Sequence, residues 1–103
     1  MMNKVEKMSH LQKLQNWFAA ECDGDWEHQN GIDIKTLDNP GWEVKIDLFE
    51  TSKMDIPFET VMEKYEDPVD WMHLKKEDNK LVGAGGPEKL DKILTIFAEW
   101  LDE

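Results

Sequence analysis

The sequence contains no arginine, so all twelve of its basic residues are lysines, and its formal net charge is −11. Arginine supplies the planar fork that grips phosphate at two points, and its absence at this charge argues against a nucleic-acid partner. Cys22 is the only cysteine, which excludes an internal disulfide. No segment approaches the roughly 20 apolar residues of a membrane-spanning helix, and the first residues lack a signal-peptide pattern. We therefore expect a cytoplasmic protein with no membrane partner.

The residues that are present predict one folded domain. A chain of 103 residues has the length of a single domain, and 40% hydrophobic residues with five tryptophans can supply one core. We assign residues 1–103 to that domain and residues 1–8 to a loose, lysine-containing lead-in.

The negative charge is concentrated in one third of the chain. Residues 21–50 contain nine acids against Lys35 and Lys45, whereas residues 1–20 are net positive. Such a surface would attract a basic protein, at a rate that falls as salt rises. Negative charge also keeps proteins soluble, so the charge alone leaves both explanations open.

Apolar periodicity predicts a helix near each end of the chain. Ser9 and Gln12 have capping-box spacing, and an apolar stripe follows over Leu11, Leu14, Trp17, Phe18 and Cys22. Residues 22–31 then form a structured loop. Near the other end, Pro87 fits the first position of a helix. That helix carries a second stripe of Leu90, Ile93, Leu94, Phe97, Trp100 and Leu101.

The middle of the chain predicts strands. Residues 32–35 and 42–48 alternate apolar and polar side chains around a turn at residues 38–41, where Gly41 could take positive φ, which indicates an antiparallel hairpin. Residues 58–65 form a third strand or a short helix, and residues 70–75 form a fourth strand. Residues around 81–82 form a fifth strand that ends at the glycine-rich residues 83–86. The predicted class is α+β: an antiparallel sheet of about five strands, flanked by an N-terminal and a C-terminal helix on one face.

Three motifs are candidates for metal binding, thiol catalysis or phosphate binding. Residues 22–28 hold a thiol, carboxylates and an imidazole, but their spacing fits neither a calcium loop nor a zinc site. Cys22 lies among acids at a helix C-terminus, which disfavours the thiolate. The glycine-rich residues 83–86 are not followed by the lysine and hydroxyl residue of a phosphate loop. We predict no catalytic residue, no metal and no cofactor.

Three blocks of residues resemble signatures of the immunity protein 53 family. The first joins residues 14–18 with residues 22–28, and the second joins residues 36–42 with Val44, Ile46 and Asp47. The third joins residues 83–87 with the closing helix through Phe97 and Trp100. The resemblance spans residues 11–101. It implies a bacterial immunity protein of a polymorphic-toxin system, which binds and blocks a cognate toxin domain in the cytoplasm.

The leading hypothesis is therefore toxin neutralisation by binding, through an acidic surface that covers a basic toxin, of which a nuclease is one example. The candidate partner-binding residues are Asp23, Asp25, Trp26, Glu27, His28, Trp42, Glu43 and Asp47. Trp26 and Trp42 are the candidate apolar anchors, since tryptophan is enriched at interface hot spots; Asp25 and Trp26 could equally be structural. The alternatives are a small metal- or thiol-dependent enzyme, given the rhodanese-like label of some relatives, and an acidic regulatory adaptor. The oligomeric state is left open.

Overall fold

The computed structural model describes residues 8–64 and 66–103 and confirms the α+β class. The expected lead-in at residues 1–8 lies outside the described residues, apart from exposed Met8. The elements in chain order are α1 (His10–Glu21), a 3-10 turn (Trp26–His28), β1 (Ile32–Leu37), β2 (Gly41–Asp47), β3 (Val61–Glu63), β4 (Met72–Glu77), β5 (Lys80–Gly85) and α2 (Leu90–Leu101).

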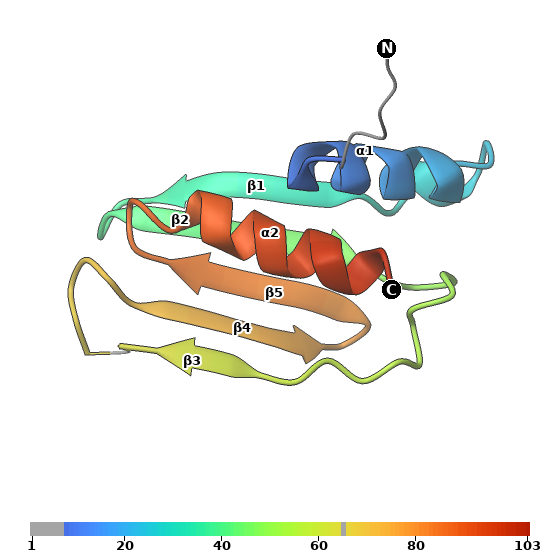
Figure 1. The fold of residues 1–103 in the computed structure, drawn as a ribbon. Helices are drawn as coiled ribbons and strands as arrows, with labels where there is room; N and C mark the ends of the chain where they lie inside the picture. The colour runs from blue at the N-terminus through green and yellow to red at the C-terminus, as the bar shows by residue number, and fades with distance from the viewer. Residues whose placement is uncertain (1–7, 65) are drawn as a thin grey trace, which may run out of the picture.

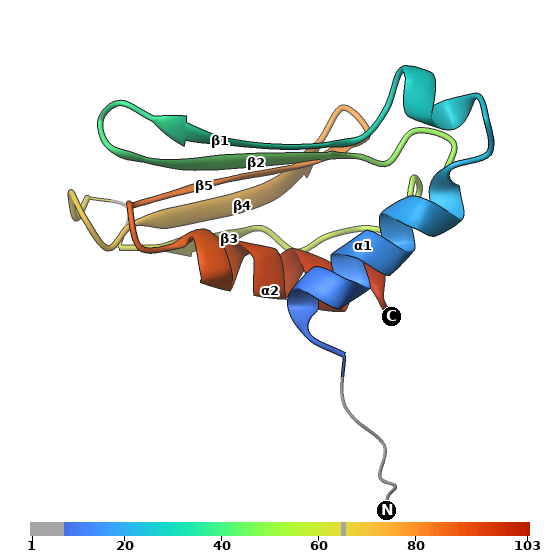
Figure 2. The ribbon, with the colours of Figure 1, turned by 90° about the horizontal axis from the view of Figure 1, so that it is seen from above.

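The five strands form one antiparallel sheet in the order β1-β2-β5-β4-β3. Both helices cover the same face, with α2 over the centre of the sheet and α1 packed beside α2, on the β1 side of the layer (Figures 1 and 2). Segments 38–40, 66–71 and 86–89 meet at one end of the strands, which we call the Pro40 end. Segments 22–31, 48–60 and 78–79 meet at the other, the Trp26 end.

Helix α1 begins as the sequence predicts, but its apolar stripe is only partly buried. Ser9 Oγ accepts from the Gln12 amide, and the Gln12 side chain accepts from the Ser9 amide, which completes the capping box. Leu14 is buried, whereas Leu11 is 57% exposed. The expectation that Leu11 faces the core is wrong, because α1 lies at the edge of the sheet and only part of its stripe meets another layer.

The β1–β2 hairpin is confirmed, with a different role for its glycine. The Asn39–Pro40 peptide is cis, and Gly41 does not take the expected positive φ. Gly41 is instead the first residue of β2, where an added Cβ would lie 2.4 Å from the carbonyl oxygen of Gly85. Glycine is required here for the close approach of two backbones.

Four elements in the second half of the chain have bounds that differ from the prediction. The fourth strand runs over Met72–Glu77, two residues later than the predicted 70–75. The third strand shrinks to Val61–Glu63, and α2 begins at Leu90, because residues 86–89 form a turn. Gly83 and Gly85 continue β5 and do not end it. A Cβ on Gly83 would lie within 3.0 Å of side-chain atoms of Leu74, Phe97 and Ile93, so glycine lets α2 pack directly on the sheet.

The two faces of the sheet have opposite character. The helix-covered face contributes Val44, Ile46, Met72, Leu74 and Leu81 to the core, all fully buried. The open face carries charges in ion pairs: Lys35–Glu43, Lys75–Glu77 and Lys80–Asp47. No helix in the described part of the chain is long and apolar enough to cross a membrane.

Candidate functional site

The loop between α1 and β1 is held by two of its own carboxylates. Asp23 Oδ1 accepts from the amides of Asp25 and Trp26 at 2.9 and 2.8 Å. The two oxygens of Glu27 accept from the amides of Asp23 and Gly24 at 2.9 and 2.8 Å. Gly24 has φ +91°, which permits the reversal between them. Asp23 and Glu27 are therefore structural as well as charged.

The same hydrogen bonds keep this loop negative. Hydrogen bonds from the Trp26 and Asp25 amides lower the pKa of Asp23 below its usual range. Hydrogen bonds from its own amide and from those of Asp23 and Gly24 likewise lower the pKa of Glu27. Within the described residues, no lysine forms an ion pair with Asp23, Asp25 or Glu27. No described cation therefore neutralises these three carboxylates.

Trp26 joins this loop to the rest of the molecule. Its side chain is only 5% exposed and packs against Trp17 and Phe18 of α1, with ring centroids 5.9 and 6.1 Å apart. Its indole N–H donates to the carbonyl oxygen of Phe49 at 2.8 Å. Trp26 is thus a core residue, as the alternative interpretation had it, and offers a partner no free surface.

The other candidates lie in three places: the Trp26 end, the open face of the sheet and the Pro40 end. Asp25 and His28 are exposed on the loop. Asp47 is also at the Trp26 end, but it accepts from the Gly31 amide and from Lys80. Glu43 lies on the open face and pairs with Lys35 at 3.3 Å. Trp42 is half-buried at the Pro40 end, where its indole donates to the carbonyl oxygen of Pro87.

The structure adds two residues, Phe49 and Glu50, to the candidate partner-binding residues, and the sequence did not indicate either. Both follow β2 at the Trp26 end, where the Trp26 indole donates to the carbonyl oxygen of Phe49, and the Phe49 side chain is 48% exposed. One signal could have found Phe49: Val44, Ile46 and Leu48 alternate inward, so an apolar residue at 49 is out of phase and points outward. We define the acidic patch as Asp23, Asp25, Glu27, His28, Phe49 and Glu50.

Thiol or metal chemistry finds little support in this loop. Desolvation and the carboxylates of Glu27 and Asp23 raise the pKa of the Cys22 thiol, which opposes formation of a nucleophilic thiolate. Among the described residues, no group of three or more His, Cys, Asp and Glu side chains is placed to hold a metal ion.

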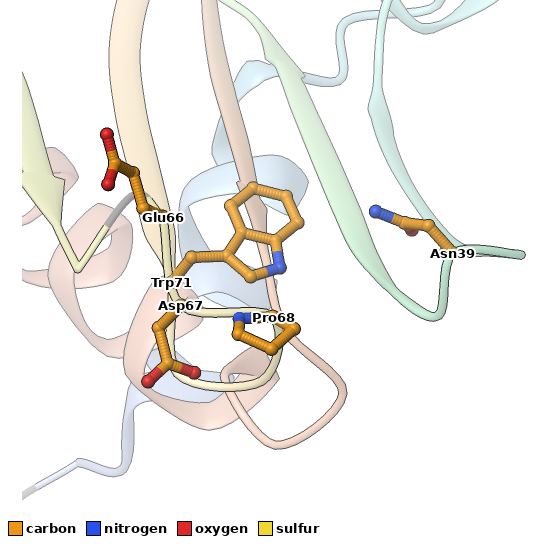
Figure 3. A pocket seen from close by; sticks show the side chains of 5 residues that line it. All are labelled: Asn39, Glu66, Asp67, Pro68 and Trp71. Atoms are coloured by element: carbon orange, nitrogen blue, oxygen red, sulfur yellow. The ribbon is translucent and has the colours of Figure 1, made fainter.

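A hollow of about 400 Å³ lies at the Pro40 end, lined by Asn39, Glu66, Asp67, Pro68 and Trp71. Figure 3 shows the Trp71 indole facing Asn39 across it, with the carboxylates of Glu66 and Asp67 on the other side of the Trp71 side chain. Asp67 accepts from the amides of Val69 and Asp70, which shapes the loop. The acids at this end therefore do not converge on the hollow.

Comparison with known proteins identifies a family. The family model described as Immunity protein 53 matches residues 11–102, nearly the whole chain. Searches of the curated proteins and of the solved structures found no match.

Proposed function

This chain belongs to the immunity protein 53 family, and from that premise we propose that it neutralises a cognate bacterial toxin domain by binding it in the cytoplasm of the producing cell, without catalysis. The acidic patch at the Trp26 end is the proposed contact surface. The observation that carries this proposal is the hydrogen bond from the Trp26 indole to the carbonyl oxygen of Phe49. It ties the backbone of Phe49, whose side chain is 48% exposed, to the loop that contains Asp23, Asp25 and Glu27.

The patch combines the two features of a binding surface for a basic protein. Asp23, Asp25 and Glu27 supply a local negative field that would increase the rate of encounter with a positive toxin surface. Phe49 supplies apolar area that a partner could bury. Because the loop is fixed by its own hydrogen bonds, little conformational freedom would be lost on binding.

The first experiment pairs this protein with the toxin domain encoded beside its gene. Co-expression should protect cells from that toxin, and the purified proteins should form a stable complex. If neither protection nor a complex is observed, toxin neutralisation is refuted.

Two variants test the patch itself. Asp25→Lys should lower the association rate severalfold at low salt, and the loss should shrink at high salt. Glu99→Lys, at an exposed position of α2, makes the same change in net charge and is the matched control. Equal effects of the two variants would show that total charge matters and the patch does not.

Phe49→Ala tests the apolar anchor. It should raise the dissociation constant about tenfold, mainly through faster dissociation. Met62→Ala, at an exposed position of β3, is the control and should leave affinity unchanged. If Phe49→Ala binds the toxin domain as tightly as the wild type does, Phe49 is not part of the interface.

A further inference from the structure

Strand β1 is a long edge of the sheet, and no other described strand pairs with its outer side. The sheet order leaves β1 and β3 at the edges, and β1 has six residues where β3 has three. Edge strands usually avoid pairing with other chains through short length, proline or a bulge, because their unpaired backbone groups are a template for another strand. The paired residues 32–37 contain no proline, and they pair with β2 in an uninterrupted register.

An apolar groove runs beside this edge on the helix-covered side. It has a volume of about 380 Å³ and lies between α1 and β1; its apolar lining is Leu11, Leu14, Phe18, Ile32 and Ile34. Leu11 is 57% exposed and Ile34 is 41% exposed, so the groove leaves apolar area open to solvent. A strand added to β1 would place its own side chains against this groove.

The charges along β1 are self-complementary. Asp33 and Lys35 both point to the open face, on either side of Ile34. In an antiparallel pair of β1 strands centred on Ile34, Asp33 of each chain lies opposite Lys35 of the other. Centring the pair on Asp33 or Lys35 would instead set like charges against each other. Opposite charges directly across an antiparallel pair stabilise it, and like charges destabilise it.

This edge carries little net charge in a strongly acidic chain. Residues 8–20 contain no acid, and β1 carries one aspartate and one lysine. Asp33 has no ion pair within the described part of the chain, although Lys35 pairs with Glu43. Two copies could approach here while the acidic loops remain at the ends of each sheet, where salt screens them.

We propose that two copies of this chain associate through β1, in the antiparallel register centred on Ile34. A two-fold axis perpendicular to the sheet would join the two sheets into one and keep both helix layers on the same face. Ile34 would then pack on its symmetry mate, and the grooves of the two chains would close against each other. This dimer does not depend on toxin binding.

The test begins with the molar mass in solution. Light scattering should show twice the 12.1 kDa of one chain, at protein concentrations between about 1 µM and 1 mM that bracket the affinity of ordinary interfaces. Ile34→Lys should return the protein to one chain, whereas Met62→Lys on the other edge should leave the dimer intact. A single-chain mass at every concentration, or a dimer that survives Ile34→Lys, overturns the proposal.

A charge exchange tests the register. Asp33→Lys alone and Lys35→Asp alone each create two like-charge pairs across the axis, and each should raise the dimer dissociation constant about tenfold or more. The double variant Asp33→Lys/Lys35→Asp restores opposite charges and should recover most of the affinity. Circular dichroism establishes that each variant is folded. If the folded double variant is as weak as the single variants, the register is wrong.

Discussion

Replacement of Gly83 by alanine should destabilise the fold, although replacing glycine by alanine often stabilises a protein by lowering the entropy of the unfolded chain. The new Cβ would lie 2.8 Å from Leu74, 2.9 Å from Phe97 and 3.0 Å from Ile93, whereas carbon atoms prefer separations of about 3.5–4.0 Å. All three neighbours belong to the buried core and have little room to move. Overpacking of this kind costs about 1–3 kcal/mol, and the lower entropy of the unfolded alanine chain offsets about 0.4–1 kcal/mol of it.

The net loss of about 1–2 kcal/mol should lower the melting temperature by about 5–15 °C. Thermal denaturation followed by circular dichroism measures it. Gly31→Ala is the matched control, because its Cβ would meet only Phe18, at 3.9 Å, and it should melt at the wild-type temperature or slightly above. Gly86→Ala should be the most damaging, since its Cβ would overlap the backbone of Val69. A Gly83→Ala protein as stable as the wild type would refute this account of the α2–sheet contact.

Two further predictions concern ionisable groups. Hydrogen bonds from Lys64 and Lys89 lower the pKa of Asp70 from 3.8 to about 2, so these contacts stabilise the fold above pH 3.8 and are lost as pH falls through about 2. Asp70→Asn should flatten the fall in urea midpoint across that range, and an unchanged pH profile would contradict this. Because desolvation and Glu27 raise the pKa of Cys22, iodoacetamide should alkylate it more slowly in the folded protein than in urea. Glu27→Gln should speed the reaction. A folded protein that reacts faster than the unfolded chain would contradict the raised pKa of Cys22.

The elements that could be predicted from the sequence are those whose periodicity is local. The alternation over residues 42–48 and the stripe over residues 90–101 report burial on one face directly, and both elements formed. The glycines of β5 were misplaced because glycine weakens a strand locally. Gly83 is instead favoured by the close approach of α2, which begins seven residues later and cannot be recognised within a short window.

The candidate site shows the same division between local and tertiary causes. The loop at residues 22–28 could be predicted, since its aspartates, glycine and glutamate make hydrogen bonds within five residues. The exposure of Trp26 and Phe49 could not be predicted, because the indole of Trp26 donates to an acceptor 23 residues away. Composition identifies aromatic residues as anchor candidates, but only the fold decides which of them solvent reaches.

The fold also decides which acidic residues have a lysine beside them. Glu43 and Asp47 contribute to the acidic third of the chain, yet the fold places Lys35 beside Glu43 and Lys80, 33 residues away, beside Asp47. Surface ion pairs contribute little to stability, but they cancel the local field on the open face of the sheet. No described lysine cancels that of Asp25. For a positive partner that binds the proposed acidic patch, charge reversal at Glu43 should therefore slow association less than charge reversal at Asp25.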